Sequence, residues 1–329
     1  MREDSLTTAN SQEQSAEDQY LPAAAGIGAA IGVVSARALA YSRGQFRERY
    51  PMREWLRFWT RPSFLAVILT CIVTPLVAPA ADESSLTKDQ IKEFLKTAEV
   101  IKSKPSSKGV THPSRLTLSN GTITHDASFQ TVDEHKAENK FENGRVELNF
   151  VDSYKYNIAA YQVAELVGMD DMLPVYVERK WEGKTGSLSW WLPVKMDDAD
   201  RVEKKIPVPD AYRDNWNNQM AKIRVFDELV YDSDPNLTNV LIGEDWTIWR
   251  IDFSRAFRTT KDLRAPKDLV KCDRQLFEKL KALNANELAE KTKNYLTKTE
   301  VNAVMARRDK IVAVFQALIA EKGENEVLY

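Results

Sequence analysis

Apolar and polar residues alternate over much of the segment from 115 to 193, and this pattern predicts β-strands. The dipeptide Asn120-Gly121, between two alternating runs, is a strong signal for a hairpin turn. A helical run interrupts the strands and stops at Gly168, a residue type that commonly ends a helix. The predicted strands are 115–119, 122–131, 146–151, 174–181 and 187–192, and the predicted helix is 153–167.

Beyond residue 193 the pattern becomes mainly helical. A polar loop at 194–214 leads into this region, and a short hairpin with strands at 237–242 and 247–252 interrupts it. A small sheet lobe followed by a larger helical lobe makes an α+β fold, and few folds have this order of elements. The predicted helices are 215–231, 273–283, 285–297 and 298–321.

A further helix is predicted ahead of the strands, from 86 to 102, because apolar residues recur there at helical spacing. Thr87 and Gln90 have the spacing of a capping box at its start. The body therefore divides into an N-terminal helix with a linker at 82–114, a sheet lobe at 115–193 and a helical lobe at 194–329.

Residues 52–81 have the layout of a secretory signal peptide. Arginines precede an apolar run at 64–77, and the cleavage signal Ala78-Pro79-Ala80 follows it. This run is shorter than the roughly 20 residues that a membrane-spanning helix needs. We therefore expect the body to be exported to the periplasm or the extracellular space.

Ahead of this segment, residues 1–20 are polar and contain little that would pack into a core, and 21–41 is rich in alanine and glycine. We expect the whole of 1–51 to be disordered, or to be an over-extended start if translation begins at Met52. An alternative is a membrane anchor in which 21–41 also inserts, so that the protein stays associated with the membrane through 64–77. Both interpretations leave the body outside the cytoplasm.

Composition and charge exclude several classes of protein. The formal net charge is −2, so there is no basic surplus that would indicate a nucleic-acid partner. The two cysteines, Cys71 and Cys272, are too few for a disulfide framework or a metal cluster. The three histidines are scattered without the spacing of zinc ligands.

Acidic and amide residues gather around the hairpin predicted at 237–252. Asn239 is the fifth residue after Asp234, and Asp252 is the thirteenth after Asn239, so the hairpin returns Asp252 close to Asn239. Phosphoryl transfer needs oxygen ligands for Mg²⁺ and a carboxylate near the attacking nucleophile. The spacing predicts Asp234 as a catalytic base and Asn239 with Asp252 as metal ligands, although Asp and Asn are also common turn residues.

This arrangement resembles the atypical kinase-like proteins of bacteria of the HipA type and the phosphoinositide-kinase type, which have an Asp-x4-Asn loop and an Ile-Asp closing motif. The resemblance covers roughly 115–260. It implies a two-lobed protein-kinase-like fold, ATP and Mg²⁺ as cofactors, and a protein, lipid or small molecule as acceptor. Within this range the resemblance also includes four shorter segments: Ala159-Ala160-Tyr161 ahead of Gly168, Leu173-Pro174, Val177-Glu178-Arg179 and Gly186-Ser187-Leu188.

Two positions depart from the kinase pattern. The resemblance implies a lysine on the third strand and a glutamate on the following helix, with the lysine holding the nucleotide phosphates. Gln130 and Asn157 stand at these positions. A lone glutamate would be a costly unpaired charge, whereas two amides can hydrogen-bond to each other without neutralising phosphate. In a different alignment another basic residue would reach the phosphates, and the candidates are Lys136, Lys140 and Lys155.

The glycine-rich loop of the pattern is represented only by Gly121, which with Gln130 and Asn157 completes the predicted nucleotide-binding set. The expected function is an exported kinase-like phosphotransferase that uses Mg-ATP on an unknown acceptor. The alternative is a catalytically impaired pseudokinase that binds or scaffolds partners in the cell envelope. A third class is a structural envelope protein in which the motif spacing is accidental.

Overall fold

The computed structural model of the protein describes residues 86–105, 113–141, 144 and 146–329. The predicted signal or anchor segment at 52–81 and the region 1–51 lie outside the described residues. Among the residues that the structure describes, no helix combines the length and the apolar character that a bilayer crossing requires.

The first part of the fold is a five-stranded antiparallel sheet with the strand order β1-β2-β3-β7-β6. Side chains of one face, among them Leu116, Ala127 and Leu188, are fully buried because helices pack against them. The strands are β1 (Glu99–Pro105), β2 (Ser114–Ser119), β3 (Thr124–Gln130), β6 (Tyr176–Trp181) and β7 (Lys184–Trp190).

The start of this region corrects one prediction. Helix α2 (Lys88–Thr97) opens with the expected capping box, but it ends before 102 because Glu99–Pro105 forms β1. Ile101, which seemed to continue the apolar face of the helix, is 55% exposed on that strand. Pairing of this edge strand with β2 therefore decides its conformation, and side-chain burial does not.

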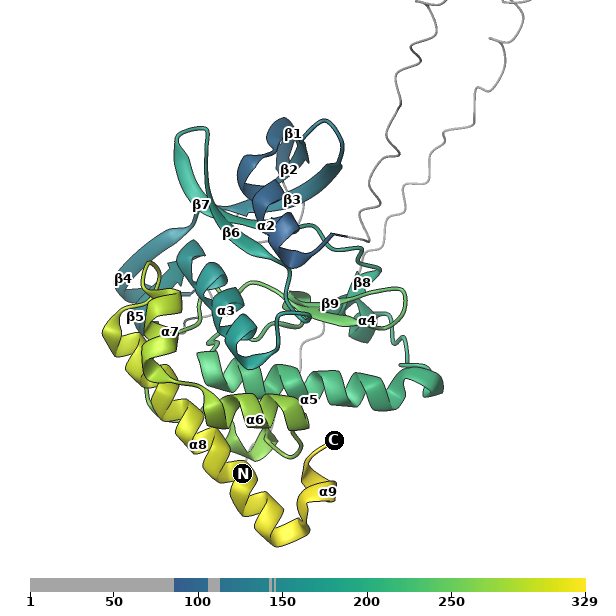
Figure 1. Ribbon diagram of the computed structural model, residues 1–329, viewed down its shortest axis with the longest axis vertical. Coiled ribbons are helices and arrows are strands. Elements are labelled where there is room, and N and C mark those ends of the chain that lie inside the picture. Colours follow the sequence, from purple (N-terminus) through teal and green to yellow (C-terminus); the bar gives the residue numbers. More distant parts are fainter. Residues whose placement is uncertain (1–85, 106–112, 142–143, 145) are drawn as a thin grey trace, which may run out of the picture. The chain divides into compact units, whose positions relative to one another are not determined.

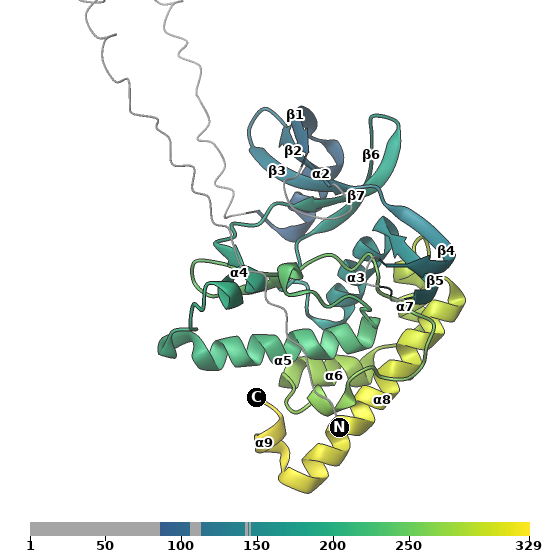
Figure 2. The same cartoon turned by 180° about the vertical axis from the view of Figure 1, so that it is seen from behind.

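A separate two-stranded hairpin, β4 (Asp133–Lys140) and β5 (Val146–Ser153), follows β3. The sequence pattern predicted part of β5 and missed β4, whose residues are almost all polar and exposed. Helix α3 (Tyr154–Val167) comes next and ends at Gly168 in a left-handed conformation, as predicted. Figures 1 and 2 show α3 between the sheet and the helices, and it contacts β6, β7, α6 and α7.

The second part of the fold is helical around a small sheet of order β10-β9-β8. The loop predicted at 194–214 in fact contains a strand and a helix, β8 and α4, while the predicted hairpin is confirmed as β9 and β10. The elements are β8 (Met196–Asp197), α4 (Asp198–Glu203), α5 (Arg213–Val230), β9 (Val240–Ile242), β10 (Ile248–Arg250), α6 (Arg274–Ala282), α7 (Ala285–Thr292), α8 (Lys298–Lys322) and α9 (Glu324–Val327).

Candidate functional site

The loop between α5 and β9 presents Asp234 to solvent. Helix α5 ends at Tyr231, whose backbone is left-handed, and the chain then turns sharply. The buried carboxylate of Asp232 accepts a hydrogen bond of 3.0 Å from the amide of Asp234, and Asn236 N donates to Asp234 O at 2.7 Å. These Asx-type contacts shape the backbone locally and leave about half of the Asp234 side chain exposed.

The β9–β10 hairpin brings Asn239 and Asp252 to the same end of the small sheet. The amide of Ile251 donates to the carbonyl of Asn239 at 3.0 Å, so the residue next to Asp252 is bonded directly to Asn239. Both side chains are half-buried. The Asp252 carboxylate accepts a long hydrogen bond of 3.4 Å from Ser254 N and, within the described chain, forms no ion pair with a lysine or arginine.

The chemistry of this donor set fits Mg²⁺ held together with a phosphate-bearing ligand. Asn239 and Asp252 supply an amide oxygen and a carboxylate, which are hard donors. Within the part of the chain that the structure describes, no three His, Cys, Asp or Glu side chains form a metal-binding group. Mg²⁺ is usually held by one or two carboxylates plus water and substrate phosphates, so two protein donors are sufficient.

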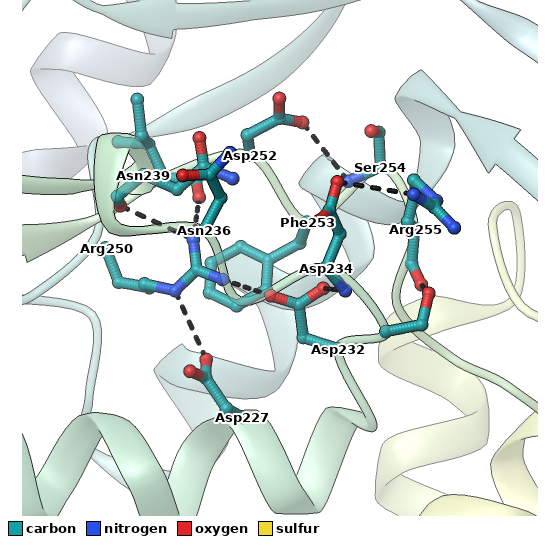
Figure 3. Close-up of polar contacts among 12 residues, drawn as sticks. Asp227, Asp232, Asp234, Asn236, Asn239, Arg250, Asp252, Phe253, Ser254 and Arg255 are labelled. Carbon is teal, nitrogen blue, oxygen red and sulfur yellow. Dashed lines mark hydrogen bonds and ion pairs between the residues drawn. The ribbon is translucent and has the colours of Figure 1, made fainter. Parts of the chain in front are cut away.

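A buried ion cluster lies beneath this end of the hairpin, and the sequence pattern gave no prediction of it. Arg250 on β10 is 1% exposed; it contacts the carboxylate of Asp232, and its Nε lies 3.4 Å from Oδ1 of Asp227 on α5. In Figure 3 both carboxylates point toward Arg250, whereas Asp252 points away from it. Burial raises the pKa of Asp227 to about 6 and also raises the pKa of Asp232.

A second cation, Arg255, contacts the candidate base itself. Its Nη1 lies 3.3 Å from Oδ2 of Asp234, and its other amino group binds Glu147 of β5. A dashed line in Figure 3 marks the contact with Asp234. The guanidinium also lies 5.3 and 5.1 Å from the ring centres of Phe141 and Phe150. The β4–β5 hairpin therefore packs directly against the segment that follows Asp252.

Gln130 and Asn157 form the hydrogen bond that the sequence led us to expect. Asn157 Nδ2 donates to Gln130 Oε1 at 2.5 Å, and Asn157 Oδ1 accepts from the amide of Phe253 at 2.6 Å. Gly186 on β7 permits this arrangement, because a Cβ there would lie 2.3 Å from the backbone carbonyl oxygen of Gln130. The end of β3, helix α3 and the residue after Asp252 are thus joined by neutral groups.

Gly121 is not brought into this group. It lies in the turn between β2 and β3, where its φ is +85°, whereas Gln130 is the last residue of β3. A strand of seven residues spans roughly 20 Å, so Gly121 is far from the Gln130–Asn157 pair. We therefore leave Gly121 out of the candidate site.

The three candidate lysines are each paired with a carboxylate. Each forms an ion pair with a carboxylate of β4, so none of these contacts directs it toward Asp252. The pairs are Lys136 with Glu134 at 2.6 Å, Lys140 with Glu138 at 3.2 Å, and Lys155 with Asp133 at 2.7 Å.

Comparison with solved structures decides the fold. A crystal structure of the Golgi casein kinase is similar, with 14% sequence identity and a TM-score of 0.53 over 75% of this chain and 78% of that chain. The fold is protein-kinase-like. The Helicobacter pylori proinflammatory kinase CtkA also matches, at 9% identity and a TM-score of 0.44, over 69% of this chain and 98% of that one. No protein-family model and no curated protein matches the chain.

The Gln130–Asn157 pair joins the end of β3 to helix α3. In protein kinases the third strand of the sheet carries a lysine that pairs with a glutamate on the helix packed beneath it. Gln130 ends β3 and Asn157 lies on α3, and their side chains are joined by a hydrogen bond. The contact between strand and helix is present but carries no charge.

Proposed function

We propose that this protein is a kinase-like phosphotransferase that uses Mg-ATP to phosphorylate a protein, lipid or small-molecule acceptor. The observation that carries the proposal is the grouping of Asp234, Asn239 and Asp252 on a kinase-like fold. Asp252 forms no ion pair within the described chain, and Asp234 is exposed beside it. A salt-bridged Asp252 would have argued for a structural role.

Each residue has a distinct role in this proposal. Asn239 and Asp252 would hold Mg²⁺, which supplies charge neutralisation for the phosphates of the nucleotide. Asp234 orients the acceptor hydroxyl and takes its proton as the acceptor oxygen bonds to the γ-phosphorus. The bond from that phosphorus to the bridging oxygen breaks, and ADP leaves. Arg255 keeps the Asp234 carboxylate in place through their contact.

A second function, nucleotide or partner binding without transfer, is favoured by the Gln130–Asn157 pair. Two amides cannot supply the positive charge that the usual lysine gives to the α- and β-phosphates. Export through 52–81 also favours this alternative, because the periplasm is ordinarily poor in ATP. Export itself, and kinship with the HipA type, remain proposals that rest on the sequence.

Calorimetric titration with Mg-ATP, followed by a radiolabelled transfer assay, tests these alternatives. Asp252→Asn should weaken the Mg²⁺-dependent part of binding, because it removes the charge of a metal ligand. The fold should be kept, because asparagine tolerates the left-handed backbone at φ 58°. Asp234→Asn should retain binding and abolish transfer. Asp245→Asn, in the exposed turn of the same hairpin, is the matched control.

The outcomes separate the two functions. Absence of binding at millimolar Mg-ATP would reject phosphotransfer and nucleotide binding and would leave only partner binding. Binding without transfer to protein, lipid or small-molecule acceptors would leave the second function. Equal losses in Asp252→Asn and Asp245→Asn would show that the metal-site assignment is wrong.

A further inference from the structure

Asn157 is a polar side chain buried in the core of the protein, and its whole amide group is engaged. It is 1% exposed on helix α3. Its Nδ2 donates to Gln130 Oε1 at 2.5 Å, and its Oδ1 accepts from Phe253 N at 2.6 Å. Phe253 directly follows Asp252. One amide therefore connects the sheet to the residue next to the candidate metal ligand.

Asp252 depends on such external support. Its backbone lies in the left-handed region, with φ 58°, which is uncommon for a residue other than glycine. Among the described residues, its own carboxylate makes one hydrogen bond, the long contact to Ser254 N. The backbone before it is held by the bond from Ile251 to Asn239, and the backbone after it by Asn157. The bond from Ser153 N to Ser254 O, at 2.8 Å, also holds this segment, so loss of the Asn157 bond would free the Phe253 amide without detaching the segment.

Gln130 is the matched partner because it determines which end of the Asn157 amide faces Phe253. A glutamine can accept from Nδ2, which turns Oδ1 toward the Phe253 amide. A lysine at 130 can only donate, so it would attract Oδ1 and turn Nδ2 toward a second donor. The absence of lysine at this position is thus linked to the presence of asparagine at 157.

We propose that Asn157 is a positioning residue that holds the metal-binding carboxylate of Asp252 through the amide of Phe253, with Gln130 setting its orientation. This inference rests on the proposed function, in which Asp252 binds a divalent cation. Side chains that hydrogen-bond metal ligands typically change metal affinity about 10- to 100-fold when they are removed.

Two substitutions at one position test it in the full-length chain. Asn157→Leu removes both polar ends at similar size, whereas Asn157→Asp keeps the acceptor for Phe253, and Gln130 can turn its amide to donate. Hydrogen exchange reports the Phe253 amide, and electron paramagnetic resonance of free Mn²⁺, with and without ATP, reports metal affinity. In Asn157→Leu we expect exchange to be at least about 10-fold faster and Mn²⁺ affinity about 10-fold weaker.

The controls distinguish positioning from packing. Asn157→Asp should keep exchange at Phe253 within about threefold of the wild type and should not weaken Mn²⁺ binding, while Val163→Ala, fully buried on the same helix, controls for loss of helix packing. Unchanged exchange at Phe253 in Asn157→Leu, or equal loss of Mn²⁺ binding in Val163→Ala, overturns the inference. If the wild type binds no Mn²⁺, the proposed metal site and Asn157's role toward it fail, while the Phe253 exchange rates still decide whether Asn157 holds the segment.

Discussion

The segment around Asp252 is attached to the rest of the protein on two sides by different chemistry. On the sheet side, the neutral amides of Gln130 and Asn157 hold the residue after it. On the helical side, Arg250, two residues before it, is enclosed by the carboxylates of Asp227 and Asp232. All of these groups except Gln130 are almost completely buried.

Neutral amides thus hold the residue after Asp252, whereas a buried ion cluster holds the strand before it. Two buried carboxylates share one buried arginine, so the helical side carries an excess negative charge when both are ionised. This charge favours a cation at the nearby Asp252 and Asn239. The amides of Gln130 and Asn157 contribute no positive charge that would favour phosphate. We infer that the divalent metal has the larger part in recruiting a nucleotide here.

The largest expected effect comes from removing the arginine of the charged attachment. Arg250→Leu leaves Asp227 and Asp232 buried without a cation, and breaking a buried ion cluster in this way costs about 3–5 kcal/mol. Urea unfolding at pH 7.5, followed by tryptophan fluorescence, measures the free energy of unfolding.

Arg264→Leu is the matched control, because the side chain of Arg264 is 37% exposed and its Nε is 4.0 Å from Glu228. It should cost less than Arg250→Leu, because the buried carboxylate of Glu228 keeps its hydrogen bonds from the backbone amides at 264 and 265. A similar loss in both variants would show that the buried cluster has no special weight.

The next effect concerns the close approach of β3 and β7 on the neutral side. Gly186→Ala places a Cβ 2.3 Å from the Gln130 carbonyl oxygen and 2.9 Å from Cγ2 of Thr131, so the strands must move apart. Such overpacking costs about 1–3 kcal/mol. The same urea titration measures the loss, and the Phe253 amide should exchange faster as Gln130 shifts.

A contrasting glycine provides the control for this steric argument. Gly168 ends α3 with φ +71°, and no atom lies within 4 Å of the place that a Cβ would take, so Gly168→Ala adds backbone strain without a clash. It should destabilise the protein by about 1 kcal/mol and leave exchange at Phe253 unchanged. Faster exchange in both variants would contradict a local role for Gly186.

A smaller effect is expected when the neutral pair is converted to a charged one. Gln130→Lys alone should destabilise the protein, because lysine turns the Asn157 amide away from Phe253. In Gln130→Lys with Asn157→Asp, the carboxylate can accept from both the lysine and Phe253. The double-mutant cycle should show a favourable coupling of about 0.5–3 kcal/mol. Additive losses would mean that the two side chains act independently.

The fold was predictable wherever side-chain burial decides the conformation. The helix that ends at Gly168 and the hairpin at Asn120-Gly121 follow from local patterns, and both are present. Strands β1 and β4 were not predictable, because they are exposed and exist through pairing with β2 and β5. Their side chains carry no alternating apolar signal.

The candidate site was only partly predictable for a similar reason. Spacing along one hairpin was enough to bring Asn239 and Asp252 together. The burial of Arg250 with Asp227 could not be foreseen, because charged residues are rarely buried and these two meet only through tertiary packing. The one local hint was a charged residue, Arg250, within an otherwise apolar strand.

The smallest expected effect is a pH dependence that belongs to the charged side alone. Burial raises the pKa of Asp227 to about 6 from an ordinary value of 3.8. Between these two values the folded chain binds more protons here than the unfolded chain, so this group's contribution to stability decreases as pH rises from about 4 to 6 and is constant above. Each unit of pKa difference corresponds to about 1.4 kcal/mol.

Asp227→Asn removes this titration, so its free energy of unfolding relative to the wild type should rise by at least about 1 kcal/mol between pH 4.5 and 6.5 and then level off. Urea titrations at pH 4.5, 5.5, 6.5 and 7.5 measure it. Asp245→Asn is the control, because hydrogen bonds from Thr247 lower the pKa of Asp245, which is therefore ionised throughout this range. A flat difference for Asp227→Asn would mean that Arg250 keeps Asp227 ionised, and the excess negative charge beneath Asp252 would then persist at every pH tested.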